Sequence, residues 1–170
     1  MQTIATIGYE GAAPDSFDAV LMRARVELVV DVRAIAISRR PGFSKSALSE
    51  RLKYRGMAYI HLRGLGDPKP GREAARAGNT ALFRKIFGEH LGTPDAQRDF
   101  EILRRLVSER RIALLCFEAD ALSCHRTIVA NRIAKSENMS ILHLKVEPGP
   151  VVDRGRTRTN NNSREGLAAA

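Results

Sequence analysis

The sequence has 170 residues, of which 44% are hydrophobic and 28% charged, as in one ordinary globular domain. This composition excludes a collagen-like or wholly disordered chain. The 28 Lys and Arg residues against 19 Asp and Glu residues give a formal net charge of +9, which favours an anionic partner, either a small molecule or nucleic acid. No apolar run approaches the roughly 20 residues of a membrane-spanning helix, so we expect no membrane partner. With two cysteines and no secretion signal, a cytoplasmic location is expected.

Short apolar segments alternate with amphipathic segments along the chain. Five segments are short, nearly continuous in apolar residues and typical of strands buried on both faces: 3–7, 27–32, 58–62, 112–117 and 141–144. Apolar residues at three- and four-residue spacing predict helices around 17–21, from 44 or 46 to 56, around 82–87, around 100–107 and from about 123 to 133. Glycines and prolines predict a turn-rich loop over 64–71.

This alternation predicts one α/β domain over residues 1–148, a three-layer sandwich with a mainly parallel five-stranded sheet of the Rossmann-like or flavodoxin-like kind. Segment 112–117 is the most apolar and should lie at the centre of the sheet. Residues 149–170 are rich in Arg and Asn and have no apolar face to pack. We expect a flexible tail there, with a nucleic-acid-binding arm as the alternative.

Polar residues follow four of the predicted strands. Tyr9 comes after the first strand, Asp31 and Arg33 end the second, His61 lies in the third and Glu118 follows the fourth. Ligands of open parallel sheets bind beyond the carboxyl ends of the strands. We therefore expect these side chains to converge on one site.

The densest of these groups is Ser123, Cys124, His125 and Arg126, at the start of the last predicted helix. Free N–H groups and the helix dipole favour an anion there and would lower the pKa of a cysteine thiol. Cys124 is therefore a candidate nucleophile, or else a small residue that packs the helix start. Cys116 is expected in the core. The Cys-x5-Arg spacing of cysteine phosphatases is absent.

A metal ion and the common organic cofactors are not expected. Cys116, Cys124, His125 and His61 offer sulfur and nitrogen ligands, but neither a Cys-x-x-Cys nor a His-Glu-x-x-His motif is present. Residues 124 and 125 would also point about 100° apart on a helix, so one ion could not easily bind both. No nicotinamide, flavin or ATP motif occurs, since segment 8–11 lacks the further glycines of a nucleotide fingerprint.

A second basic element is the loop 38–45, which contains Arg39, Arg40, Phe43 and Lys45. Arginine suits phosphate recognition, and Phe43 would either stack on a base or anchor the loop to the core. The alternative is a solvated charged loop.

The order of these motifs resembles the domain of unknown function 488 family over roughly residues 3–145. The resemblance rests on segments 6–11, 30–33, 38–45, 59–66 and 115–118 and on the Cys-His-Arg run at 124–126. It implies an α/β sandwich of bacterial and archaeal cytoplasmic proteins and no settled reaction. The site residues that it implies are Asp31, Arg33, Arg39, Lys45, His61, Glu118, Cys124, His125 and Arg126.

We expect from these observations a hydrolase or transferase that binds an anionic, phosphate-bearing nucleotide or nucleic-acid-derived substrate at the C-terminal edge of the sheet. Asp31 or Glu118 would act as general base, His125 or His61 would transfer protons, and Cys124 would serve any covalent step. The residues expected to bind the substrate are Tyr9, Arg33, Arg39, Lys45, Ser123 and Arg126. The alternatives are a non-catalytic nucleic-acid-binding module and a small-molecule sensor.

Overall fold

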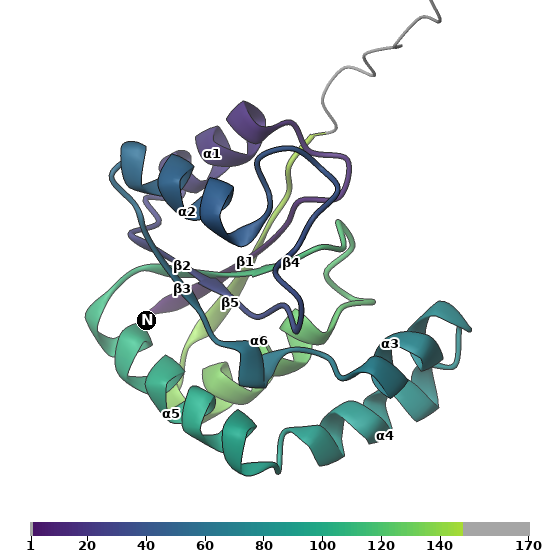
Figure 1. Ribbon diagram of the computed structural model, residues 1–170. Helices are drawn as coiled ribbons and strands as arrows, with labels where there is room; N and C mark the ends of the chain where they lie inside the picture. The colour runs from purple at the N-terminus through teal and green to yellow at the C-terminus, as the bar shows by residue number, and fades with distance from the viewer. Residues whose placement is uncertain (1, 148–170) are drawn as a thin grey trace, which may run out of the picture.

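A computed structural model describes residues 2–147 of the chain. Strands and helices alternate along it (Figure 1). In order they are β1 (Thr3–Gly8), α1 (Pro14–Arg23), β2 (Leu28–Asp31), α2 (Lys45–Tyr54), β3 (Ala58–His61), a 3-10 turn η1 (Arg63–Leu65), α3 (Lys69–Arg76), α4 (Thr80–His90), α5 (Pro94–Glu109), β4 (Ile112–Cys116), α6 (His125–Glu137) and β5 (Ser140–Leu144). The predicted tail at 149–170 lies outside the described residues.

The five strands form one sheet in the order β3-β2-β4-β1-β5. Every pairing is parallel, so all carboxyl ends lie at the same edge. The register aligns Asp31 with His61 and Leu115, and it aligns Gly8 with Cys116. The single α/β domain with a parallel sheet is therefore confirmed, and the most apolar strand, β4, is the central one.

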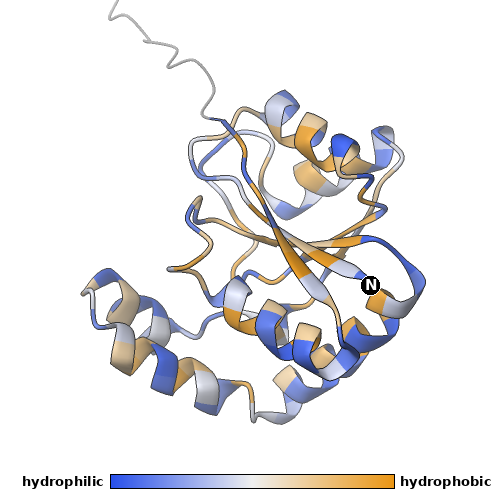
Figure 2. Cartoon of the chain, turned by 180° about the vertical axis from the view of Figure 1, so that it is seen from behind, coloured by the Kyte–Doolittle hydropathy of each residue, from blue (hydrophilic) through white to orange (hydrophobic). Residues whose placement is uncertain are grey.

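Helices cover both faces of the sheet, and each face has its own hydrophobic core (Figure 1). Because side chains of a strand alternate between faces, Val30 packs toward α3, α4, α5 and α6, whereas Val29 packs toward α1 and α2. Figure 2 shows the consequence in the sequence pattern: the strands are largely hydrophobic, while the helices carry hydrophobic and hydrophilic stripes. Within residues 2–147, none of the helices combines the length and the apolar character that crossing a membrane requires.

The connections after neighbouring strands leave toward opposite faces of the sheet. Helices α1 and α2, which follow β1 and β2, both cover one face, but α6, which follows the intervening strand β4, covers the other. In open parallel sheets such a divergence leaves a crevice at the carboxyl ends of the strands, where ligands bind. The carboxyl end of β4 is therefore the position that the fold favours for a site.

Helix α3 replaces part of the loop that the sequence predicts over 64–71. It begins at Lys69 with Pro70 in its first turn, where a proline costs nothing because the N–H of that position has no helical partner. Gly71 packs against Asp67, since a Cβ there would lie 2.0 Å from Asp67 Oδ1 and would push that side chain aside. The residues that suggested a loop are thus the ones that begin this helix.

Candidate functional site

A buried ion pair occupies the end of β2. Arg33 Nε and Nη2 donate to the two carboxylate oxygens of Asp31, at 2.9 and 2.6 Å. Arg33 Nη1 donates to Tyr9 Oη at 2.9 Å and to the carbonyl oxygen of Phe43 at 2.8 Å. Tyr59 Oη donates to Asp31 Oδ2 at 2.5 Å. We call Tyr9, Asp31, Arg33 and Tyr59 the Asp31 network, and it joins β1, β2 and β3 with the loop before α2.

The contacts of the Asp31 network are internal to the protein. Burial by itself would lower the pKa of Arg33, but the hydrogen bond and the charge of Asp31 outweigh burial and raise it. Burial and then the charge of Asp31 raise the pKa of Tyr59. Each guanidinium nitrogen of Arg33 and both oxygens of Asp31 have protein partners. The roles of Asp31 as general base and of Tyr9 and Arg33 as anion ligands stay predictions, and the geometry shows these residues engaged with one another.

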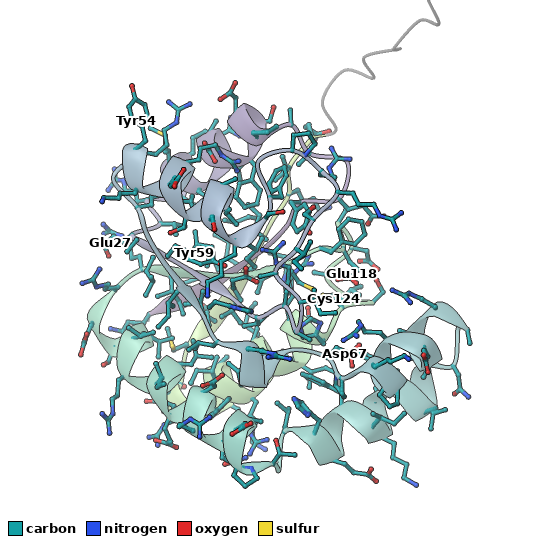
Figure 3. All side chains as sticks on the ribbon, in the orientation of Figure 1. Glu27, Tyr54, Tyr59, Asp67, Glu118 and Cys124 are labelled. Carbon is teal, nitrogen blue, oxygen red and sulfur yellow. The ribbon has the colours of Figure 1, made fainter. Side chains whose placement is uncertain are left out.

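Four side chains with metal-ligating atoms meet at the end of β4. We call Cys116, Glu118, Cys124 and His125 the sulfur cluster, and one ligating atom of each lies within 4.8 Å of the others. Both thiols donate to Glu118 Oε2 at 3.0 Å. His125 Nδ1 lies 3.6 Å from the sulfur of Cys116 and 3.9 Å from that of Cys124. Figure 3 shows the side chains of Glu118 and Cys124 in this region.

The backbone directs the side chains of Cys124 and His125 into the same cluster although the two residues are neighbours in sequence. Cys124 is the N-cap of α6, in an extended conformation (φ −112°, ψ 141°), and the helix begins only at His125. The 100° angle expected between helical neighbours therefore does not apply to this pair. The other ring nitrogen, His125 Nε2, lies 2.8 Å from the carbonyl oxygen of Val32, and Phe87 of α4 packs edge-on against the ring.

Arg126 fixes the loop between β4 and α6. Its side chain is buried, with Nη1 donating to the carbonyl oxygen of Glu118 and Nη2 donating to that of Ala119 at 3.2 Å. The end of β1 approaches the same loop so closely that a Cβ at Gly8 would lie 1.8 Å from the carbonyl oxygen of Glu118. The anion-binding role of Arg126 stays a prediction, and its contacts in the structure are with the loop backbone.

The environment of the thiols opposes a free thiolate. Burial raises the pKa of Cys116, and it raises that of Cys124 well above the ordinary value of a thiol. Burial alone would raise the pKa of Glu118 as well, but hydrogen bonds from both thiols lower it. Cys124 is thus a protonated, buried thiol rather than a group activated by the helix, because desolvation outweighs the dipole. Its role as a nucleophile stays a prediction that this environment does not favour.

A basic cleft of about 840 Å³ lies beside the end of β3. It lies between the segment after β2, the η1 turn and the starts of α3 and α5. The charged and imidazole side chains that line it are His61, Arg63, Lys69, Arg72, His90, Asp95, Arg98 and Asp99. A second hollow, of about 540 Å³, is at the opposite edge of the sheet and contains none of the predicted site residues.

Asp67 is close enough to charged groups of both the cleft and the sulfur cluster for their charges to act on it. Its side chain is 94% buried, being 6% exposed, and Oδ1 has no hydrogen-bond partner among the described residues. Burial raises its pKa, the charges of His125 and Arg72 oppose that rise, and the charge of Glu118 adds to it. Because Arg72 lines the cleft and His125 and Glu118 belong to the cluster, Asp67 links the two regions electrostatically.

Three of the predicted binding residues lie on the exposed surface. Arg39, Lys45 and Ser123 are exposed, and none of them lines the basic cleft. Phe43, in contrast, is fully buried and stacks on Tyr9 with ring centroids 4.5 Å apart, so it anchors the basic loop to the core. Of the predicted residues, the cleft contains His61, and the sulfur cluster contains Glu118, Cys124 and His125.

Most residues that line the cleft carry no motif in the sequence. Arg63, Arg72 and His90 line the cleft but are not among the predicted site residues, because Arg63 and Arg72 flank the loop predicted over 64–71 and His90 follows the helix predicted around 82–87. The signal present was the position of this loop directly after a strand end, at the edge where sites form. Cys116 is buried as expected, and it also belongs to the sulfur cluster.

Comparison with known proteins supports the resemblance that the motifs indicated. Neither the curated proteins nor the solved structures gave a significant match. The family model described as domain of unknown function DUF488 matches residues 14–133, which include the Asp31 network except Tyr9, the basic cleft and the whole sulfur cluster. The chain therefore belongs to the DUF488 family.

Proposed function

We propose that this protein is a hydrolase or transferase that binds a phosphate-bearing small molecule in the basic cleft at the C-terminal edge of the sheet. The observation that carries the proposal is the charge of this cleft. Arg63 and Arg72 form no ion pair within residues 2–147, whereas Arg98 is paired with Asp95 at 2.8 Å. Arg72 Nη1 donates to the carbonyl oxygen of Asp67. Two guanidinium groups that line one hollow without an ion-pair partner in the described part of the chain favour a doubly charged anion such as a phosphate monoester.

The size of the cleft favours a small molecule over a nucleic-acid chain. Its volume of about 840 Å³ falls in the range of roughly 300–1,000 Å³ that is typical of small-molecule sites. A nucleic-acid-binding module would instead need a basic surface that continues along several nucleotides. The exposed Arg39 and Lys45 do not line the cleft.

Two imidazoles give the cleft groups that can move protons. His61 Nε2 lies 2.7 Å from the carbonyl oxygen of Arg33, and His90 Nε2 lies 2.8 Å from that of Gly64. When Nε2 carries the proton donated to the carbonyl, Nδ1 keeps its lone pair and accepts a proton from an attacking water or hydroxyl group. His61 is the predicted catalytic residue that this role fits, because it lies at the end of β3 and lines the cleft.

The binding test compares two exposed arginines. Phosphate and a panel of mononucleotides are titrated calorimetrically into the wild type, Arg63→Ala and Arg39→Ala. Loss of a charge-assisted hydrogen bond costs about 1.5–3 kcal/mol, so Arg63→Ala should weaken binding about 10- to 100-fold. Arg39→Ala, a matched change outside the cleft, should bind as the wild type does.

Each result that would contradict the proposal points to a different alternative. If Arg39→Ala weakens binding and Arg63→Ala does not, the basic loop and not the cleft holds the anion. If the protein binds only oligonucleotides, with an affinity that falls steeply with salt, the nucleic-acid-binding alternative is correct. Conversion of the bound compound, lost in His61→Ala with binding retained, would establish an enzyme, and tight binding without conversion would establish a sensor.

A further inference from the structure

The sulfur cluster has the donor set of a zinc site. We propose that Cys116, Cys124, His125 and Glu118 bind one Zn²⁺ ion in tetrahedral coordination at the carboxyl end of β4. Thiolate and imidazole are the ligands that zinc selects, and four protein donors complete its usual coordination number. The proposal does not depend on the proposed function, because the cleft that carries that function contains none of these four residues.

The four distances from the sulfurs to the nitrogen and oxygen donors are close to those of a tetrahedral site. With zinc–sulfur bonds of about 2.3 Å and zinc–nitrogen or zinc–oxygen bonds of about 2.0–2.1 Å, a sulfur lies about 3.5 Å from a nitrogen or oxygen ligand. His125 Nδ1 is 3.6 and 3.9 Å from the two sulfurs, and Glu118 Oε2 is 3.0 Å from each. Shifts of about half an ångström at Glu118 are enough to admit the ion.

The surroundings orient His125 as a ligand. Its Nε2 lies 2.8 Å from the carbonyl oxygen of Val32, and a proton on Nε2 leaves the lone pair on Nδ1, which faces the two sulfurs. A ligating histidine commonly donates its other ring N–H to a backbone carbonyl, which fixes both its tautomer and its ring plane. Phe87 packs against the same ring from α4 and limits its rotation.

A buried carboxylate beside the cluster is a second observation that points to a cation. Asp67 is 94% buried, since it is 6% exposed, and its Oδ1 has no hydrogen-bond partner among residues 2–147. Glu118, itself a carboxylate, is close enough for its charge to act on Asp67. Two carboxylates in a desolvated region cost free energy unless positive charge compensates them, and the charges of His125 and Arg72 act on Asp67 in that direction. A divalent ion at the cluster adds the remaining compensation.

Binding balances in protons and charge. Both thiols are protonated in the metal-free protein, where they donate to Glu118. Zn²⁺ replaces these two thiol protons, which pass to the solvent, and bonds form to two sulfurs, one nitrogen and one oxygen. No electron is transferred. Because four protein donors close the coordination sphere, the ion stabilises structure, joining β4 to α6 directly and to β2 through the hydrogen bond of His125.

The test uses the full chain and zinc alone. The protein is reduced, stripped with a chelator, freed of both reagents without air and supplied with Zn²⁺, and bound metal is counted by native mass spectrometry. We expect one ion per chain. Cys116→Ser and Cys124→Ser should each weaken binding by more than about 100-fold, beyond the 10- to 100-fold cost of losing an outer-shell partner. Ser123→Ala, adjacent in sequence but exposed, should bind as the wild type does.

Cobalt gives a readout that does not require the variants to fold. Wild-type protein with Co²⁺ should show intense visible bands of tetrahedral coordination and a near-ultraviolet charge-transfer band from two thiolates, and zinc should displace both. A folded, reduced wild type that takes up no zinc overturns the proposal, as does a stable Cys116–Cys124 disulfide that forms in place of metal uptake. Zinc binding that is lost in His61→Ala but retained in Cys124→Ser would place the ion in the cleft and also overturn it. Repeating the phosphate titration on stripped and zinc-loaded protein separates a failure of the zinc site from a failure of the cleft.

Discussion

The two buried polar assemblies at the strand ends differ in how completely their groups are paired. In the Asp31 network, both oxygens of Asp31 and every guanidinium nitrogen of Arg33 have protein partners. In the sulfur cluster, both thiols donate to the one oxygen Glu118 Oε2, and the neighbouring Asp67 Oδ1 has no hydrogen-bond partner among the described residues. A network in which every polar group has a hydrogen-bond partner holds strands in position. Polar groups that converge and are only partly hydrogen-bonded can bind a ligand.

The largest expected effect comes from removing one partner of the buried ion pair in the Asp31 network. Arg33→Ala leaves the carboxylate of Asp31, which is 0% exposed, without its counter-charge. Breaking a buried pair in this way costs about 3–5 kcal/mol of unfolding free energy, measured by urea denaturation. The matched control is Arg98→Ala, whose partner Asp95 is 74% exposed and whose loss should cost less than about 1 kcal/mol. Equal losses in the two variants would contradict the structural role of the network.

A smaller effect, stabilisation of the fold by zinc, distinguishes the sulfur cluster from the Asp31 network. With free Zn²⁺ at 100 times its dissociation constant, the free energy of unfolding of the wild type should rise by about 2.7 kcal/mol. Cys124→Ser should lose this increment, and Arg33→Ala should keep it even though it lowers the starting stability. If Arg33→Ala abolished the stabilisation by zinc, zinc binding would depend on the Asp31 network and the two assemblies would not be independent.

The smallest effect concerns pH. Tyr59→Phe removes one hydrogen bond to Asp31 and should lower the free energy of unfolding by about 1.5 kcal/mol near neutral pH. The pKa of Tyr59 is raised in the folded state, so the unfolded chain ionises first as pH rises above about 10. The stability that Tyr59 contributes is therefore complete below that pH and is lost above it. Urea denaturation between neutral and alkaline pH should show the difference between wild type and Tyr59→Phe narrowing, and a widening gap would refute the direction of this shift.

The sequence predicts the sheet well because burial on both faces leaves a direct pattern. All five strands and the central place of β4 follow from apolar runs, and parallel order follows from the helices between them. Helix α3 does not follow, since Pro70 and Gly71 are read as signs of a loop. Proline is compatible with a first helical turn, and the close packing of Gly71 against Asp67 is visible only in the structure.

The candidate site is less predictable, because residue type does not reveal pairing. Arg33 and Arg126 resemble anion ligands in sequence, yet each is used inside the protein, one by Asp31 and the other by loop carbonyls. The position of Cys124 one residue before α6, which turns its sulfur toward Cys116, depends on backbone angles that no motif encodes. That Glu118, Cys124 and His125 all lie near the end of one strand, by contrast, follows from the order of strands and helices.

The geometry of the sulfur cluster depends on Gly8, at the end of β1, although β1 supplies none of the donor atoms. The backbone of β1 touches the carbonyl oxygen of Glu118 where any side chain would collide with it. The absence of a side chain at Gly8 therefore determines how closely the loop that carries Glu118 approaches β1. Any residue larger than glycine would lift this loop and move the carboxylate relative to the two sulfurs, without altering a single donor atom.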